Sequence, residues 1–209
     1  MKKLILFLAV CLFSYANSQV KASEDQKKLY AKANAVFLPV GVLNAGIEHQ
    51  LSNKWTMQEE IFISPWKSFA GKYAQVYMGG VEGRYYFKEA FKHWYIGGNI
   101  HFARYKFQKY NYWTDEPYQY EPHSPVYVSS NLYQDGYAIM VGATVGYQWQ
   151  INDNWNLDLF VGGGHSEGFY KGFDKVSGAR YDTDPTREYN RSGEWVPYKG
   201  GLMISYRLK

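Results

Sequence analysis

Apolar residues alternate with small or polar residues over long stretches of this chain. From Tyr137 to Ile151 the odd positions are apolar or aromatic, whereas the even positions are mostly small or polar. A helix would mix these two sets, but a strand places them on opposite faces. After the short turn "NDN" the alternation resumes at Trp155. This stretch therefore predicts a β-hairpin with one apolar face.

The same alternation recurs along the chain and predicts eight strands. We expect them over residues 31–38, 43–51, 55–64, 76–87, 94–107, 137–151, 155–161 and 198–208. The connections "SNK", "KEAFKH" and "NDN" are short, whereas "PWKSFAGKYA" and the segments 109–135 and 171–194 are long. Short and long connections alternate when strands run up and down with all short turns at one end. The sequence therefore predicts an all-β chain that forms an eight-stranded antiparallel up-and-down β-barrel.

Two features indicate that the apolar face of this barrel lies outside and meets lipid. Four tryptophans beside the short turns fall on the apolar face, as an aromatic girdle at a membrane interface would: Trp55, Trp94, Trp149 and Trp155. The opposite face is small and polar, and the interior of an eight-stranded barrel is just wide enough for side chains to fill. We therefore expect a transmembrane β-barrel. The alternative is a secreted, lipocalin-like barrel with its apolar face turned inward around a ligand.

Charged residues of both signs fall on the face that the barrel would enclose. They are Glu48, Glu60, Glu82, Arg84, His101, Asp158, Lys199 and Arg207. Charges aimed into a barrel are typical of an ion path or an acid–base site. A narrow barrel must also pair the polar groups that it encloses, because an unpaired buried charge is costly. We favour this second interpretation, a paired polar network that fills the lumen.

The N-terminus is typical of an exported protein. Two lysines precede an apolar run over residues 4–13, and the small residues of "ANSQ" follow. This pattern predicts a secretory signal peptide over residues 1–18 and a single β-barrel domain over residues 19–209. Cys11 is the only cysteine, so the mature domain has no disulfide, thiolate metal site or cysteine nucleophile. The formal charge of +4 is too small to indicate a nucleic-acid partner.

Catalytic motifs are weak in this chain. The segment "GGGHSEGF" contains His165, Ser166 and Glu167, but neighbouring residues of a strand point to opposite faces, which separates the histidine from the serine. The five histidines show no paired spacing typical of a metal site. We therefore expect no catalysis, no cofactor and no metal.

The long tyrosine-rich connection is the better candidate for binding. Its aromatic residues offer rigid contact surface at a low entropy cost, which suits a glycan, a peptide or another envelope protein. An alternative is that they cap the barrel and meet lipopolysaccharide head groups. The residues in question are Tyr110, Tyr112, Trp113, Tyr118 and Tyr120.

Several segments together resemble one known family. They are "WTMQEEIFISPW", "VEGRYYF", "HWYIGGNIHFARY", "GYAIMVGATVGYQWQINDNWNLDLFVGGG" and "PYKGGLMISYRLK". Over residues 33–208 the chain resembles DUF3575, a family of small outer-membrane β-barrel proteins found in Bacteroidetes. The resemblance implies an integral protein in the outer membrane of a Gram-negative bacterium. The chain departs from the family pattern at Glu59, where an apolar residue is expected, and in its long tyrosine-rich connection.

The last strand also resembles the C-terminal signal by which outer-membrane barrels are recognised for assembly. It reads Lys199, Gly201, Ile204, Tyr206. We therefore expect a monomer with a structural or surface-interaction role, whose partners are outer-membrane lipid, lipopolysaccharide and the barrel assembly machinery. A narrow pore, a lipid A-modifying enzyme and a secreted lipocalin-like binder remain the alternatives.

Overall fold

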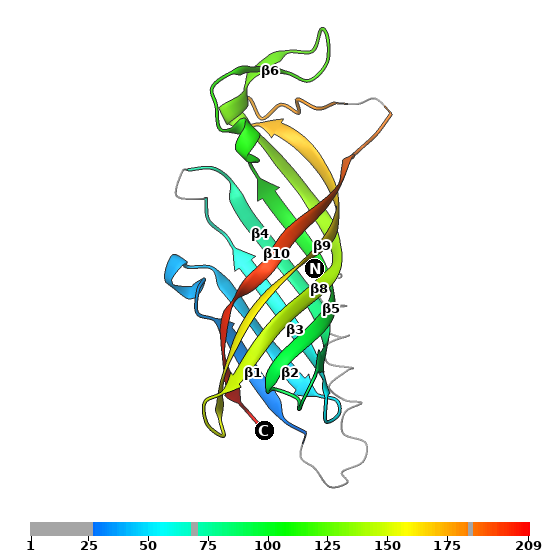
Figure 1. Ribbon diagram of the computed structural model, residues 1–209. Coiled ribbons are helices and arrows are strands. Elements are labelled where there is room, and N and C mark those ends of the chain that lie inside the picture. Colours follow the sequence, from blue (N-terminus) through cyan, green and yellow to red (C-terminus); the bar gives the residue numbers. More distant parts are fainter. Residues whose placement is uncertain (1–26, 68–70, 184–185) are drawn as a thin grey trace, which may run out of the picture.

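The computed structural model describes residues 27–67, 71–183 and 186–209, and the predicted signal peptide lies outside these residues. Eight long strands form one antiparallel sheet that closes into a barrel, in the order β1-β10-β9-β8-β5-β4-β3-β2 (Figure 1). They are β1 (Leu29–Asn34), β2 (Leu43–Gln50), β3 (Trp55–Ser64), β4 (Ala74–Tyr86), β5 (His93–Phe107), β8 (Leu132–Gln150), β9 (Trp155–Asp174) and β10 (Asn190–Arg207). The up-and-down order agrees with the sequence pattern.

The remaining elements lie in the connections. Two short strands, β6 (Pro117–Gln119) and β7 (Val126–Val128), form a separate two-stranded sheet between β5 and β8. The 3₁₀ helices are η1 (Leu38–Val40), η2 (Tyr110–Tyr112) and η3 (Ser129–Asn131). No helix in the described part of the chain is long and apolar enough to cross a membrane.

The wall of the barrel has two heights. All eight strands pair in the lower part, which we call the closed half, and there β1 pairs with β10 from Asn34↔Met203 to Tyr30↔Arg207. Above it, β8, β9 and β10 continue upward without β1 and β2 (Figure 1). We call this extension, residues 132–140, 164–174 and 190–197, the tall wall.

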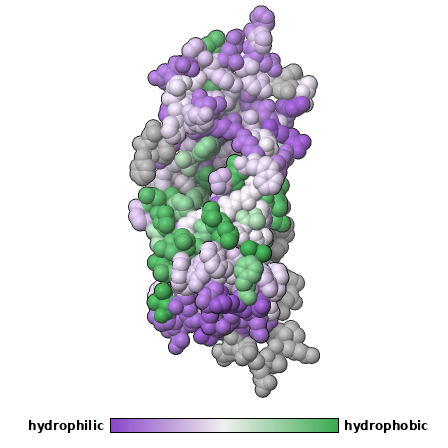
Figure 2. Space-filling view, viewed as in Figure 1, coloured by the Kyte–Doolittle hydropathy of each residue, from purple (hydrophilic) through white to green (hydrophobic). Residues whose placement is uncertain are grey.

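The two faces of the closed half differ in chemistry. Inward side chains of β2, β3, β4, β5 and β9 are buried and mostly polar or charged, whereas outward side chains such as Ile96, Val141 and Leu159 are exposed. Figure 2 shows hydrophobic residues gathered across the middle of the molecule, with hydrophilic residues towards both ends. The alternation in the sequence therefore separates a polar interior from an apolar exterior.

The first strand is shorter than predicted. β1 ends at Asn34 rather than at residue 38, and the chain turns through η1 before β2 begins. Pro39 has no N–H to add to the ladder, and Gly41 takes a left-handed conformation with φ of 71°. The turn chemistry, rather than the apolar pattern, decides where this strand stops.

The last three long strands are longer than predicted. The pattern predicts a connection over residues 171–194, but β9 continues to Asp174 and β10 begins at Asn190. The strand predicted from residue 137 begins at Leu132. Glycines and charged residues interrupt the alternation by which a strand is recognised, as at Asp135 and Gly136 in β8 and at Gly193 and Glu194 in β10.

A β-bulge in β10 changes which residues point inward. The register shifts between Pro197 and Lys199, so one extra residue is inserted opposite β9. As a result both Tyr198 and Lys199 reach into the lumen, where the Tyr198 hydroxyl donates to Asn99. Regular alternation over the predicted strand 198–208 places Tyr198 on the apolar face with Leu202 and Ile204, and the bulge shows that this placement is wrong.

Candidate functional site: the polar lumen

A lower cluster of four charged residues crosses the closed half. Lys32 Nζ lies 2.7 Å from Glu48 Oε2 and 2.5 Å from Asp158 Oδ2. Arg84 Nη1 lies 2.8 Å from Asp158 Oδ2 and 3.1 Å from Glu48 Oε2. The side chains of all four residues have 0% exposure. Each cation therefore bridges the same two carboxylates inside a closed wall.

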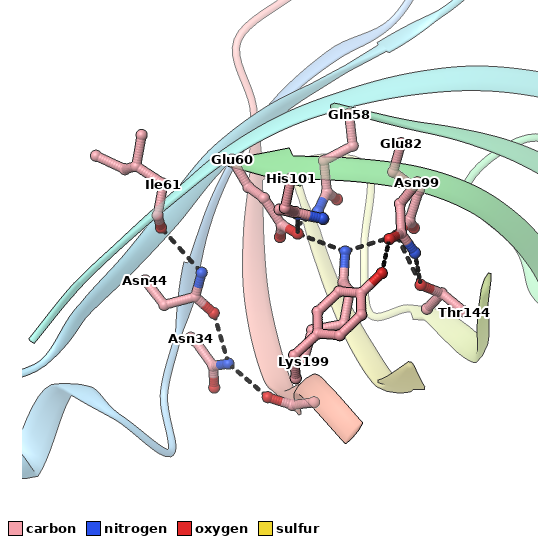
Figure 3. A network of polar contacts seen from close by, with 12 residues as sticks. Asn34, Asn44, Gln58, Glu60, Ile61, Glu82, Asn99, His101, Thr144 and Lys199 are labelled. Carbon is pink, nitrogen blue, oxygen red and sulfur yellow. Dashed lines mark hydrogen bonds and ion pairs between the residues drawn. The ribbon is translucent and has the colours of Figure 1, made fainter. Parts of the chain in front are cut away.

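An upper cluster lies above it and contains Glu60, Glu82, His101 and Lys199 (Figure 3). The His101 Nε2 atom lies 2.8 Å from Glu60 Oε1. Lys199 pairs with Glu60 and lies 2.6 Å from Glu82 Oε2. In Figure 3 the lysine side chain points between the two carboxylates, which come from β3 and β4.

One guanidinium joins the two clusters. Arg84 Nε donates to Glu82 Oε1 at 2.6 Å, while its Nη1 atom bonds the lower cluster. The eight residues comprise four carboxylates and three permanent cations, which leaves one excess negative charge unless His101 is protonated. The arrangement therefore neutralises most of the charge that the barrel encloses.

Neutral hydrogen-bond donors extend the network. Tyr86 and Tyr95 donate from their hydroxyls to Glu48 and Asp158, each at 2.8 Å. Thr144 Oγ1 donates to Glu82 at 2.7 Å. Charge-assisted hydrogen bonds of this kind are stronger than neutral ones. Side chains rather than open space therefore occupy this level of the lumen, as expected for a barrel of eight strands.

The structure places seven of the eight predicted lumen residues together in the two clusters. Arg207 is the exception: it lies half-buried at the lower end of β10, and its Nε donates to the Lys209 carbonyl oxygen at 3.0 Å. Lys32 was missed, although it stands between Ala31 and Ala33 and so follows the alternation. The first strand is only 6 residues long and offers few alternating positions, so the inward placement of Lys32 was not recognised.

The four predicted girdle tryptophans lie on the outer face at the end with the short turns. Trp55, Trp94, Trp149 and Trp155 are all exposed. Tyrosines lie beside them: Tyr147 is 5.2 Å from Trp94 and 4.6 Å from Trp149 between ring centroids. These rings form a band around one end of the closed half.

A hollow on the outer face separates apolar side chains above and below it. Small residues lie side by side on neighbouring strands, in the register Gly83↔Gly98↔Ala143↔Gly163. The hollow has a volume of about 880 Å³, and Trp55 and Trp195 also line it. It opens on the exterior of the wall, and none of the eight clustered residues is among its lining residues.

The segment with His165 and Ser166 does not form a catalytic pair. Both residues lie within β9, and His165 lies on the outer face, where its Nε2 atom is 3.5 Å from Glu167 Oε2. The next residue of a strand points to the other face. Across the described residues, no group of three or more histidine, cysteine, aspartate and glutamate side chains is arranged to hold a metal ion.

The tyrosine-rich connection folds over its own aromatic core. Tyr112 is buried with Leu132 and Tyr181, and Tyr118 and Tyr120 pack against them. Burial raises the pKa of Tyr118 to about 12 and raises that of Tyr181 well above its ordinary value. We call this group, with Tyr127, the tyrosine cap.

This packing corrects part of the predicted binding surface. Tyr112, Tyr118 and Tyr120 are occupied by contacts within the cap and offer little surface to a ligand. Tyr110 and Trp113 remain available, with 82% and 49% exposure.

Comparison with known proteins agrees with the resemblance read from the sequence. No curated protein matches the chain. The family model of DUF3575, described as a protein of unknown function, matches residues 4–208, so the chain belongs to this family.

Proposed function

We propose that this protein is an integral outer-membrane β-barrel with a sealed lumen, and that its role is structural or surface-interacting rather than catalytic. The observation that carries the proposal is the inverted distribution of polarity. Arg84 and Asp158 are fully buried inside, whereas Ile100 on the outer face is 56% exposed. A barrel in water buries apolar side chains and exposes charges. Lipid outside the barrel explains the reverse.

The height of the apolar band supports the same proposal. On β5 outward residues are apolar from Trp94 to Phe102, and Arg104 and Lys106 follow. A tilted strand of roughly 9 residues spans the hydrocarbon layer. The tryptophan band at the short-turn end then lies at one membrane interface, where aromatic rings are enriched.

Two ionisable residues interrupt the outer face. Glu59 lies half-buried opposite Ile47 and Val81, and His49 lies two positions lower along the neighbouring strand. Carboxylates on the lipid face of a barrel cost less than basic residues, and the cost falls towards the interface. His49 lies towards the short-turn end, whereas Glu59 lies midway between Trp55 and Ile63 on β3 and is an exception to the apolar band.

The alternatives fit the geometry less well. A pore needs an open path, but side chains of 0% exposure bridge the lumen at the level of Arg84. A lipid-modifying enzyme needs a coupled base and nucleophile, which His165 and Ser166 do not provide. A lipocalin-like binder needs an open apolar interior, whereas buried ion pairs cross the middle of this one.

The partners that we propose follow from this location. Membrane lipid would surround the apolar band, and lipopolysaccharide would meet the charged residues above it. The assembly machinery would recognise the last strand through residues such as Ile204 and Tyr206. The tall wall and the tyrosine cap would then stand outside the cell and present the interacting surface.

Fractionation of native cells tests the location directly. We expect the mature protein in outer membranes separated on a density gradient, resistant to carbonate and high salt. Recovery as a soluble protein would contradict the proposal. It would mean that the apolar face lines the interior of a soluble barrel. Planar-bilayer recordings would separate the sealed barrel, which gives no discrete conductance steps, from a pore, which does.

A matched pair of substitutions tests what surrounds the outer face. Ile100→Arg places a charge in the apolar band, and in lipid this costs about 2–4 kcal/mol. Val176→Arg makes a similar change at a residue that is 75% exposed in the connection after β9, where we expect less than about 0.5 kcal/mol. Unfolding by urea in lipid vesicles measures both. If both substitutions are equally harmless, water rather than lipid covers Ile100.

A further inference from the structure

The upper part of β10 has a neighbouring strand on one side only. β9 pairs with β10 from Asn190 to Tyr206, whereas β1 reaches only Met203 to Arg207 (Figure 1). Just above, Ala35 N–H donates to the Leu202 carbonyl at 2.8 Å, and Asn34 Nδ2 donates to the Gly200 carbonyl at 3.0 Å. Higher up, the side of β10 away from β9 pairs with no other strand among the described residues.

The register shows which backbone groups face this free edge. Leu202 and Gly200, whose carbonyls face β1, lie opposite odd-numbered residues of β9. Pro197, Trp195 and Gly193 also lie opposite odd-numbered residues of β9. Since backbone groups of an antiparallel strand alternate in direction, these three also face away from β9. Pro197 has no N–H, which is why proline is tolerated at an edge.

Among the described residues, Pro197 and the bulge beside it guard only the lower end of this edge. Natural edge strands are commonly guarded by unpaired charges, bulges or a covering loop. Here Trp195 is 82% exposed, and Gly193 has no side chain. The charges beside them are engaged within the protein, because Arg191 pairs with Glu167 and Glu194 pairs with Lys109, each at 2.8 Å. The edge therefore keeps its hydrogen-bonding groups and an aromatic contact surface.

The chemistry of the edge selects its occupant. A row of alternating N–H and C=O groups is matched by the backbone of another extended chain. A second copy fits poorly, because copies in one membrane share their orientation and their tilted β10 strands would cross rather than align. We propose that the edge of β10 from Gly193 to Pro197 accepts an extended peptide segment of another protein as an added β-strand. Its location outside the cell and the argument against a second copy rest on the proposed function, but the edge itself does not.

The incoming strand would be selected by alternate side chains. On the outer face it would lie beside Trp195, which favours an aromatic or β-branched neighbour. On the inner face it would lie beside Glu194 and the Lys109 that pairs with it, which favours a polar neighbour. Backbone hydrogen bonds would supply most of the affinity. Contact with Trp195 would decide which side chains are preferred in the incoming strand.

Hydrogen exchange on the full mature chain in lipid nanodiscs tests the proposal. The probe is a synthetic peptide with the sequence of residues 161–170, "VGGGHSEGFY", a segment that is extended in the structure and pairs there with the other edge of β10. We expect the amides of Gly193 and Trp195 to exchange fast without peptide, and those of Glu194 and Val196 to exchange slowly. Saturating peptide should slow the first two. A peptide N-methylated at alternate residues should leave them fast.

One substitution removes the edge donor while a matched one keeps it. Gly193→Pro removes the N–H that faces the free edge, and we expect peptide affinity to fall at least about tenfold. Gly193→Ala keeps the N–H, and the nearest atoms to its added Cβ, at 3.2 Å and 3.3 Å, belong to the His165 and Glu167 side chains. Its peptide affinity should stay near that of the unchanged protein.

Three results would overturn the proposal. Slow exchange of Gly193 and Trp195 in the free protein would mean that this chain already covers its own edge. Exchange unaffected by millimolar peptide, or equal affinity for the proline and alanine variants, would mean that the edge does not accept a strand. Protection that depends on protein concentration alone would assign the edge to a second copy. If the protein proves soluble, the same measurements can be made in buffer. A failure of the membrane proposal would therefore not be confused with a failure of the edge proposal.

Discussion

The closed half and the tall wall are stabilised by different interactions. In the closed half every strand has two neighbours, and the enclosed charges bridge one another at 0% exposure. In the tall wall the number of neighbours falls, and aromatic contacts around Tyr181 cover its upper end. Ring closure lets this chain enclose charged residues, because it excludes water while it brings opposite charges together. Where the ring is open, ion pairs such as Arg191–Glu167 are exposed, and aromatic packing supplies the buried contacts.

The sharpest test of this difference removes one cation from each region. Arg84→Met leaves Glu48, Glu82 and Asp158 without their shared partner, and we expect a loss of about 3–5 kcal/mol in the free energy of unfolding. Lys171→Met breaks the exposed pair with Glu188, 2.9 Å long, and should cost less than about 1 kcal/mol. Urea unfolding in lipid vesicles, followed by tryptophan fluorescence, measures both. Equal losses would contradict the comparison.

A second test compares two glycines of β4, one facing inward and one facing outward. An added Cβ at Gly80 would lie 2.2 Å from His101 Cδ2, whereas at Gly83 nothing lies within 4 Å. We expect Gly80→Ala to destabilise the barrel by about 1–3 kcal/mol through overpacking. Gly83→Ala should change stability by less than about 0.5 kcal/mol. The same unfolding measurement applies, and a larger effect at Gly83 would show that the lumen is not tightly filled.

A third test separates the cap from the barrel below it. Tyr181→Ala removes the ring that Tyr112, Tyr118, Tyr120 and Tyr127 all contact. Because the cap forms a cluster of its own, we expect faster limited proteolysis of residues 108–131 and an almost unchanged unfolding midpoint. Tyr110→Ala, at a highly exposed ring, is the control. A large shift of the midpoint would mean that the cap and barrel unfold together.

Alkaline pH should loosen the cap gradually. Burial raises the pKa of Tyr118 from 10.0 to about 12, so the folded cap favours the neutral phenol. The resulting stabilisation is complete below pH 10 and is lost as the pH rises towards 12. Proteolysis of the cap, measured alongside tyrosinate absorbance, should therefore accelerate within this window. If proteolysis instead accelerated around pH 10.0, the ordinary pKa of tyrosine, burial of the Tyr118 ring would be contradicted.

The sequence predicted the closed half well because one face of each strand is apolar and the other polar. Alternation located β3 and the short turn before β9, and it placed Glu82 and Asp158 on the inner face. It failed where that contrast is absent. Glycines and charged residues such as Gly193 and Glu194 interrupt the alternation in the tall wall, so β10 was begun at Tyr198 rather than at Asn190.

Other misses have local causes. The bulge at Tyr198 changes the parity of β10, and no period-based pattern detects a single inserted residue. Lys32 was overlooked because β1 is only 6 residues long. Arg207 has the expected parity, but the strand ends before a carboxylate comes within reach. The mutual packing of the cap tyrosines depends on contacts distant in sequence, which composition does not reveal.

The position of Lys32 on the first strand also constrains the order of assembly. Its partner Asp158 is 126 residues away along the chain, and the strand that carries Lys32 pairs with the last strand to be synthesised. Contacts so distant in sequence form slowly, since a long loop must close first. Glu48 lies on the neighbouring β2, only 16 residues from Lys32, so their ion pair does not depend on that seam. Until the seam closes, Asp158 therefore has Arg84 as its only ion-pair partner within the lower cluster. Closure both completes the hydrogen-bonded ring and brings Lys32 to Asp158, which makes it a single cooperative step late in folding.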